Sequence, residues 1–347
     1  MKAIQFVDKC RAEAIEVEPE SSPAPGEALV RTHRMGICGT DTSAFLGKFP
    51  FFEFPRIPGH ELGVEVVAVG GSVDQISVGD RCSLEPYFNN PLSPTSKRGL
   101  TNCCTDLQVF GVHCDGGLRT GSYTVPANKL HPGNGLSYEQ LALVEPLAIG
   151  FHAVERAAPS PGETALVIGA GPIGLACLEF LKLYDIELIV IDLDEGRLEF
   201  CQQHLGVQHT LSPDPNGGQL AAIEKITGGQ LADLVVDATG SAGSMSSCFD
   251  YAGFGARIIF LGVTSDEVHF PHAPIFHRRE LTLKASRNAL PQNFSDIIDL
   301  LSAGKIDLDP WITHRLGIEE VPERFAEVIS PEAGAIKAVI DTTTNNS

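Results

Sequence analysis

The segment from Ala165 to Asp192 constrains the fold of this chain more than any other. It begins with the apolar run Ala165–Ile168, as expected for a buried parallel strand, and continues with glycines at 169, 171 and 174. In that spacing the first glycine permits a sharp turn, the second lets the backbone approach a diphosphate, and the third lets a helix pack closely on the strand. The segment therefore predicts a strand, a glycine turn and a helix within a doubly wound α/β domain.

The same segment predicts a dinucleotide site. Pro172 stands in the first helical turn, where a missing N–H group costs least, and the free N–H groups of that turn suit a diphosphate. The next apolar run, Leu188–Ile191, ends at Asp192, whose carboxylate is placed to accept hydrogen bonds from an adenosine ribose and to repel a 2′-phosphate. This predicts NAD rather than NADP. The alternative to a dinucleotide site is an ordinary glycine-rich turn between a strand and a helix. Arg197 could flank the adenine or could equally be a solvated surface arginine. The residues expected at the dinucleotide are Gly169, Gly171, Pro172, Ile173, Gly174, Asp192, Leu193, Arg197, Ala238, Thr239, Val263 and Arg287.

Size and charge exclude several classes of protein. A chain of 347 residues is long enough for two domains, each with its own core. The net charge of −19 argues against nucleic acid and anionic membranes as partners, and there is no apolar run of transmembrane length. Nine cysteines without regular spacing, and an N-terminus without the apolar core of a signal peptide, predict a cytoplasmic protein.

Two turns in the first part of the chain carry chemistry. Short β-like segments there predict a small, mostly antiparallel, barrel-like domain. One turn contains Cys38 and Asp41, and the other contains His60 and Glu61. Cysteine, histidine and glutamate are ligands of an open catalytic zinc site, and Asp41 is suited to hold the other nitrogen of His60. The alternatives are a buried cysteine and a solvated turn, since spacing alone cannot join the two. The β-like segments are Lys2–Val7, Ala28–Met35, Gly63–Val69 and Arg81–Leu84.

Further elements are expected along the rest of the chain. Helical periodicity extends over Tyr138–Ala157 and over Phe294–Ala303, and the final TTTNNS is expected to be loose. Strands, with the turns that follow them, are expected at Asp233–Gly240, Arg257–Gly262, Leu281–Ser286 and Ala335–Ile340, and a further element at Val321–Ile329.

Five motifs in this order and spacing resemble the zinc-dependent medium-chain dehydrogenase/reductase family, the alcohol dehydrogenase superfamily. They are Gly36–Asp41, Gly59-His60-Glu61, Val78-Gly79-Asp80-Arg81, Glu145-Pro146-Leu147 and the turn at 169–174. The resemblance extends from Met1 to about residue 341. It is closest to the polyol and sugar-acid branch, because Glu145 stands where liver-type alcohol dehydrogenases have cysteine. It implies a GroES-like, mostly β catalytic domain of residues 1–153 and 287–347, and a Rossmann cofactor domain of residues 154–286.

The resemblance also implies a site. The catalytic zinc is held by Cys38, His60 and either Glu61 or Glu145, and Thr40 is the hydroxyl beside the substrate oxygen. NAD is the cofactor, and the protein is a homodimer or homotetramer. Two departures from the family pattern matter. Ser43 replaces a relay histidine, which puts the outer end of the proton path in doubt. Three of four cysteines of a structural-zinc lobe are replaced by Asn90, Ser93 and Ser96, with Cys104 kept, so one zinc per chain is expected and Phe88–Thr101 is expected to be an ordinary loop.

The substrate is the last expectation. The segments Pro50–Arg56 and Ser286–Ala289 resemble bacterial relatives that oxidise hexonic acids such as gulonate or galactonate at a secondary carbon. Phe45, Phe51 and Phe52 are expected to wall the substrate pocket, and Arg287 to bind a carboxylate. The expected activity is hydride transfer between NAD(H) and a secondary hydroxyl of a sugar acid or polyol. The alternatives are a sorbitol-like polyol or general secondary alcohol dehydrogenase, a zinc-free enone or quinone reductase, and a non-catalytic nucleotide-binding protein.

Overall fold

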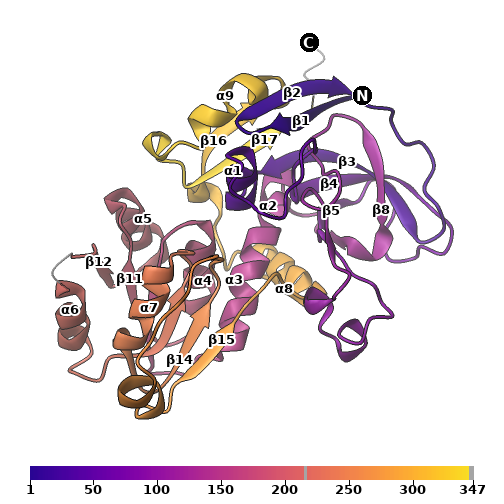
Figure 1. Ribbon diagram of the computed structural model, residues 1–347. Coiled ribbons are helices and arrows are strands. Elements are labelled where there is room, and N and C mark those ends of the chain that lie inside the picture. The colour runs from indigo at the N-terminus through magenta and orange to yellow at the C-terminus, as the bar shows by residue number, and fades with distance from the viewer. Residues whose placement is uncertain (215–216, 344–347) are drawn as a thin grey trace. The chain divides into compact units, whose positions relative to one another are not determined.

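The computed structural model describes residues 1–214 and 217–343, and these form two compact units (Figure 1). Unit 1 comprises Met1–Pro146 and the chain from Ala289, and unit 2 comprises Leu147–Asn288. Unit 2 thus begins and ends a few residues outside the expected cofactor domain, residues 154–286. The end of the polar tail expected to be loose lies outside the described residues.

Unit 1 is built on a mostly antiparallel sheet with strand order β16-β17-β3-β4-β5-β9, in which β8 also pairs with β3. Only β16 and β17 run parallel. A separate hairpin, β1 (Lys2–Asp8) and β2 (Arg11–Glu16), precedes it. The strands of the main sheet are β3 (Glu27–Gly36), β4 (Glu61–Val69), β5 (Arg81–Leu84), β8 (Ser122–Pro126), β9 (Leu130–Pro132), β16 (Ile312–Gly317) and β17 (Lys337–Asp341).

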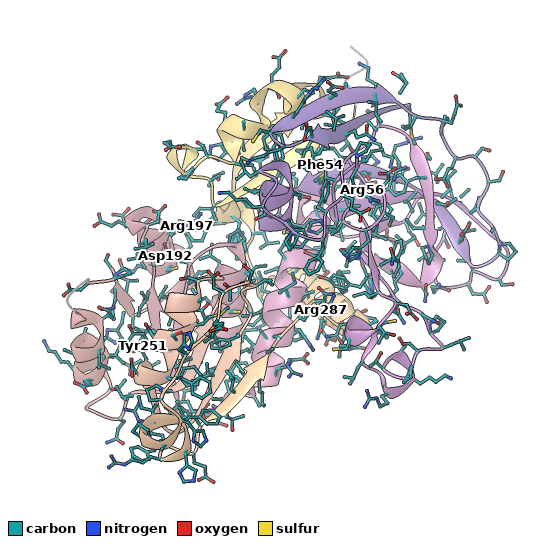
Figure 2. The ribbon with its side chains drawn as sticks, in the orientation of Figure 1. Phe54, Arg56, Asp192, Arg197, Tyr251 and Arg287 are labelled. Atoms are coloured by element: carbon teal, nitrogen blue, oxygen red, sulfur yellow. The ribbon has the colours of Figure 1, made fainter. Side chains whose placement is uncertain are left out.

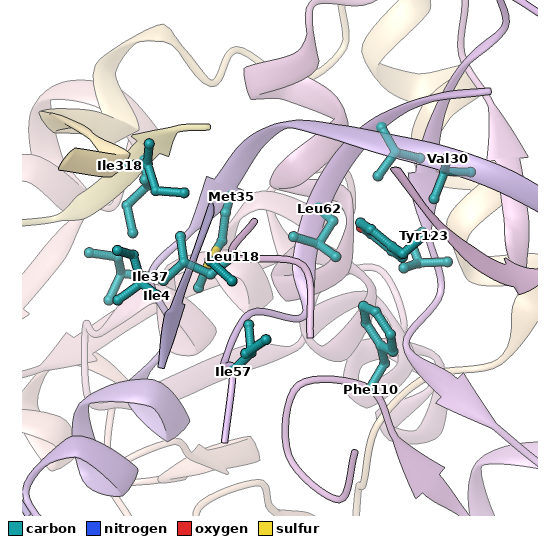
Figure 3. Packing of buried hydrophobic residues seen from close by; sticks show 14 of the residues in the cluster. Ile4, Val30, Met35, Ile37, Ile57, Leu62, Phe110, Leu118, Tyr123 and Ile318 are labelled. Atoms are coloured by element: carbon teal, nitrogen blue, oxygen red, sulfur yellow. The ribbon is translucent and has the colours of Figure 1, made fainter. Parts of the chain in front are cut away.

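Helices and a short ribbon complete unit 1. Helix α2 packs directly on β4. The two are so close at Gly63 that a Cβ added there would stand 2.1 Å from the carbonyl oxygen of Tyr138. The elements are α1 (Gly39–Phe45), α2 (Tyr138–Ala142), α8 (Pro291–Ser302), α9 (Val321–Val328), and the ribbon strands β6 (Tyr87–Phe88) and β7 (Gln108–Val109). The alternating apolar residues of the strands meet in one core, part of which is seen in Figure 3, where Met35, Leu62 and Leu118 lie together. The mostly antiparallel β architecture expected for this part of the chain is thereby confirmed.

Unit 2 is a six-stranded parallel sheet in the order β12-β11-β10-β13-β14-β15, with helices along it (Figure 1). The order turns at β10, which pairs with both β11 and β13. This is the doubly wound arrangement expected from the glycine turn. The strands are β10 (Thr164–Ile168), β11 (Glu187–Ile191), β12 (His209–Leu211), β13 (Ala232–Asp237), β14 (Ala252–Phe260) and β15 (Thr282–Ala285); the helices are α3 (Val144–Ala157), α4 (Pro172–Leu181), α5 (Glu195–Leu205), α6 (Gly218–Ile226) and α7 (Ala242–Tyr251).

Several elements differ from the sequence expectations. The helical region Tyr138–Ala157 is two helices, α2 and α3, because α2 ends at a cap at Leu143. The segment expected to be an ordinary loop contains a 3₁₀ turn at Ser96–Arg98. Strands β2, β6, β7, β9, β12 and β16 were not expected; β12, for example, spans three half-buried residues, too few to show alternation. None of the helices within residues 1–214 and 217–343 combines the length and apolar character needed to cross a membrane.

Phe45 occupies a different place from the one expected. Its side chain is 3% exposed, and its ring packs against those of Phe6 and Phe325 at centroid distances of 5.3 and 4.9 Å. Phe52 is buried beside the same Phe6 ring. The expectation that Phe45 and Phe52 wall a substrate pocket is therefore corrected, because both rings are packed in the hydrophobic core. Of the three phenylalanines, Phe51 alone is exposed, at 61%.

This packing gives a first prediction. Phe45→Ala should lower the free energy of unfolding by about 3–5 kcal/mol, because it leaves a cavity among aromatic rings. Phe51→Ala, the matched control, should change it by no more than about 0.5 kcal/mol. Urea unfolding of both variants measures the difference. Equal, small losses would show that the ring of Phe45 is not part of the core.

Candidate functional site

The pairing of β3 with β4 brings the cysteine turn and the histidine turn together. Gly36, at the end of β3, lies opposite Glu61, at the start of β4. Cys38 follows two residues after Gly36 and caps helix α1, with its sulfur accepting a hydrogen bond from Thr40 N at 3.4 Å. His60 immediately precedes Glu61 and is buried. Strand register therefore supplies the link that sequence spacing could not.

Asp41 lies between the two turns. One carboxylate oxygen accepts from Cys38 N at 3.0 Å, and the other is 3.6 Å from Nδ1 of His60. Burial of the ring lowers the pKa of His60, but the nearby negative charges of Asp41 and Cys38 outweigh burial and raise the pKa well above its ordinary value. The structure thus places Asp41 where it can orient the His60 ring.

Glu61 and Glu145 are both buried but have different partners. Lys337, from β17, donates from Nζ to Oε1 of Glu61 at 2.6 Å and to the carbonyl oxygen of Ile37 at 2.9 Å. Glu145, in the first turn of α3, accepts on Oε1 from the hydroxyl of Tyr87. Its Oε2 has no hydrogen-bond partner among the described residues. Burial raises the pKa of Glu145 to about 7, opposed by the positive charge of His60.

These groups have the chemistry of a zinc site. A half-buried thiol, an imidazole and a carboxylate oxygen without a partner are the donors of an open catalytic centre. Cys38 and Glu145 both contribute to the raised pKa of His60, as negative groups near an imidazole do. In the part of the chain that the structure describes, no three His, Cys, Asp or Glu side chains are close enough to hold an ion as they stand. The residues fit zinc by donor type and by burial.

The glycine turn of unit 2 is open where a diphosphate would lie. Gly169 has φ of +95°, and a Cβ on Gly174 would stand 1.7 Å from the Gly169 carbonyl oxygen, so neither tolerates a side chain. A Cβ on Gly171 would meet only Arg197 Nη1, at 3.7 Å. Pro172 opens α4, as expected. The turn therefore has an exposed cradle with a guanidinium beside it.

Asp192 and the neighbouring residues gather around this turn. Its Oδ2 accepts from Ala170 N at 2.5 Å, and its Oδ1 from Asp194 N at 2.8 Å. Asp192 and Arg197 are labelled next to each other in Figure 2. Leu193 is 85% exposed. A carboxylate held against the glycine turn fits a ribose hydroxyl as a partner.

The remaining expected cofactor residues follow the strands β13, β14 and β15. Thr239 donates from its backbone N and its Oγ1 to Asp237, at 3.0 and 2.9 Å. Val263 is 75% exposed and lies next to Gly240: a Cβ added to this glycine would stand 3.1 Å from the Val263 carbonyl oxygen. Arg287 is exposed just after β15. All therefore lie at the carboxyl ends of parallel strands, the edge where such sheets bind ligands.

Two residues at the cluster of unit 1 were missed from the sequence. Tyr87 stands in the Glu85-Pro86-Tyr87 stretch, where nothing signals a contact with Glu145. Lys337 does leave a signal, since this lysine directly precedes the apolar run Ala338–Ile340 of the same strand. A buried lysine needs a charged partner, which sequence alone does not identify.

The comparisons with known proteins cover both units. Residues 24–135 match the alcohol dehydrogenase GroES-like domain, and residues 172–303 match the zinc-binding dehydrogenase domain. L-galactonate-5-dehydrogenase of Escherichia coli K12 is 37% identical, covering 92% of this chain and 93% of the relative. D-altritol 5-dehydrogenase of Agrobacterium fabrum C58 is 33% identical, covering 96% and 97%.

Solved structures agree with this assignment. An alcohol dehydrogenase from Escherichia coli CFT073, complexed with NADH, has a TM-score of 0.90 at 28% identity and covers 98% of this chain and 99% of that one. A protein from Sinorhizobium meliloti 1021, bound to NADP, has a TM-score of 0.89 at 26% identity and covers 98% of each chain. On the two domain matches and the extent of the identity, this chain belongs to the zinc-binding alcohol dehydrogenase family.

Proposed function

We propose that the protein is an NAD-dependent, zinc-containing dehydrogenase that interconverts a secondary hydroxyl and a ketone in a sugar acid or polyol. The observation that carries the proposal is the register of β3 and β4, which joins the turns of Cys38 and His60, together with the buried Glu145, whose Oε2 has no hydrogen-bond partner among the described residues. Relatives named for galactonate and altritol support the substrate class.

Cys38, His60 and Glu145 are the proposed zinc ligands. Oε2 of Glu145 and Oε2 of Glu61 both lack a hydrogen bond among the described residues, but both oxygens of Glu61 lie within ion-pair distance of Lys337 Nζ, at 2.6 and 2.5 Å. A carboxylate neutralised by an ammonium is a poorer donor to a cation than one with a free oxygen. Glu61 is therefore the alternate ligand, available when it leaves Lys337.

No structural zinc is proposed. The lobe that would hold it is joined by hydrogen bonds instead: Ser93 Oγ donates to Ser96 Oγ at 2.9 Å, and Asn90 N donates to Cys104 Sγ at 3.3 Å. Three of the four positions thus carry neutral amide or hydroxyl groups, which are weak donors to zinc compared with thiolate.

The protein's own groups orient the reactants. Asp41, 3.6 Å from Nδ1 of His60, orients the ring, and the Thr40 hydroxyl, two residues after Cys38, takes or relays the substrate proton. Gly171 leaves space for the diphosphate, and Asp192 orients the adenosine ribose. When bound, zinc supplies Lewis acidity toward the substrate oxygen and NAD supplies the hydride acceptor.

Assembly and location are also proposed. We expect a homodimer or homotetramer, and the free edge of β15 supports this: within the described residues β15 pairs only with β14, and it exposes Leu283. A second copy of β15 would satisfy its unpaired backbone groups. A cytoplasmic location is supported by the nine cysteines, all of which are free thiols in the structure.

The first test is metal content. Purified protein should hold about one zinc per chain. Cys38→Ser should lose zinc and reduce turnover beyond the roughly 10- to 100-fold effect of losing a supporting residue. Cys114→Ser, a second half-buried cysteine, should do neither. Two tightly bound zinc ions per chain, or near-full activity of Cys38→Ser, would contradict the proposed metal site.

The second test is cofactor choice. The enzyme should use NAD in preference to NADP, because Asp192 repels a 2′-phosphate by about 1 to 4 kcal/mol at 4 Å, depending on the effective dielectric. Asp192→Ala should narrow the ratio of kcat/KM values, and Glu199→Ala, which removes an exposed carboxylate from α5, should leave it unchanged. Equal efficiency of the unmodified enzyme with NADP would refute the assignment.

The third test is the substrate, for which Arg287 is the proposed carboxylate reader. With NAD as the cofactor, kcat/KM is measured on hexonates and on the matching neutral polyols, for the unmodified enzyme and for Arg287→Ala. Loss of a charge-assisted pair should cost the acids roughly 2–4 kcal/mol in kcat/KM and the polyols far less. Arg278→Ala, an exposed arginine before β15, is the control. Equal losses on both substrate classes would make Arg287 a cofactor or structural residue.

A further inference from the structure

The two carboxylate oxygens of Glu145 differ in their hydrogen bonding. Oε1 accepts the hydroxyl proton of Tyr87, and Oε2 is without a hydrogen-bond partner among the described residues. Both side chains are buried, with 1% of Glu145 and 2% of Tyr87 exposed. Buried polar atoms are rarely left unpaired, so each exception calls for an explanation. A hydrogen bond that engages one oxygen fixes the rotation of the carboxylate and leaves the lone pairs of the other for a cation.

Tyr87 is itself held firmly on both sides. Glu85, two residues earlier, is fully buried, and its oxygens lie 2.5 Å from Lys129 Nζ and 3.2 Å from His131 Nε2. Its backbone N donates to the Lys129 carbonyl oxygen at 2.8 Å. After Tyr87, strand β6 pairs with β7. The backbone around Tyr87 is thus fixed by the buried contacts of Glu85 with Lys129 and His131 and by a strand pair.

The ring of Tyr87 is fixed by the same neighbourhood. It meets Phe294 of α8 edge to face, at a centroid distance of 6.2 Å. Phe294 in turn stacks on His131 at 4.9 Å. The buried contacts of Glu85 that hold the backbone therefore also support the aromatic surface against which Tyr87 rests. Little freedom remains for the hydroxyl other than to point at Glu145.

We infer that Tyr87 is a positioning residue for the metal centre, and that the Glu85–Lys129–His131 triad is the support that fixes it. Tyr87 engages Oε1 of Glu145, which leaves Oε2 as the oxygen that would be offered to zinc. This inference rests on the proposed function, in which Glu145 is a zinc ligand. The competing explanation is that Tyr87 and Glu145 only satisfy each other as buried polar groups.

The test is the zinc affinity of the full-length protein, measured by competition with a chelator. Tyr87→Phe removes only the hydroxyl and should weaken zinc binding about 10- to 100-fold, the usual effect of losing a group that supports a ligand. Tyr123→Phe is the matched control: this ring is equally buried in unit 1, and its hydroxyl pairs with Thr32 Oγ1 at 2.6 Å. Tyr123→Phe should leave the zinc affinity unchanged, although this variant also loses a buried hydrogen bond. Wild-type zinc affinity in Tyr87→Phe would overturn the inference.

Measuring the same change in the Glu145→Ala variant separates this inference from the proposed function. In Glu145→Ala, a further Tyr87→Phe change should not weaken zinc binding any more. If Glu145→Ala weakens zinc binding and Tyr87→Phe does not, the positioning role is wrong and the ligand set stands. If Glu145→Ala binds zinc like the unmodified protein, the ligand set itself is wrong.

A pair of replacements covers the case in which Tyr87→Phe does not fold. Tyr87→Gln keeps an N–H donor, and Tyr87→Leu has a similar size without one. A tenfold tighter zinc affinity for the glutamine variant would support the inference, and equal affinities would overturn it.

Discussion

Gly36 lies opposite Glu61 where β3 and β4 pair, and it has no side chain to meet that carboxylate. A Cβ at this position would stand 2.0 Å from Oε2 of Glu61. On its other side Gly36 pairs with Val339 of β17, so a single residue joins the strands that carry Glu61 and Lys337. The cysteine turn, the histidine turn and the buried lysine meet only because of this three-strand register.

The burial of so many ionisable groups in one place has to be offset by pairing. A buried charge without a partner costs several kcal/mol, and the cluster meets that requirement in two ways. Glu61 has a full counter-charge in Lys337, whereas Glu145 has only a neutral phenol. The two carboxylates are therefore unequal, although they are both glutamates and both buried. The protein itself satisfies the first, and the second has capacity left for a cation.

The parts of this structure that could be predicted are those with local signals. The glycine turn, the strands beside it and the ends of β3, β4 and β5 follow from glycine spacing and apolar runs. The metal cluster needed more, because the pairing of Gly36 with Glu61 joins turns that spacing alone leaves apart. The contact of Lys337 with Glu61 crosses 276 residues, and no local pattern encodes it. Phe45 was misplaced for a similar reason, since its neighbours Phe6 and Phe325 come from opposite ends of the chain.

The split of unit 1 into two stretches of chain has a consequence for its synthesis. Unit 2 is continuous and can fold as soon as it leaves the ribosome, whereas β3 and β4 emerge long before β17. At about 5–20 residues per second, Glu61 waits on the order of tens of seconds for Lys337, which follows 276 residues later. During that interval the nascent sheet lacks the strand that neutralises its buried carboxylate, and its edge at β3 is open. The last native sheet contact of this protein is therefore made by a strand that also completes the charge balance of its metal cluster.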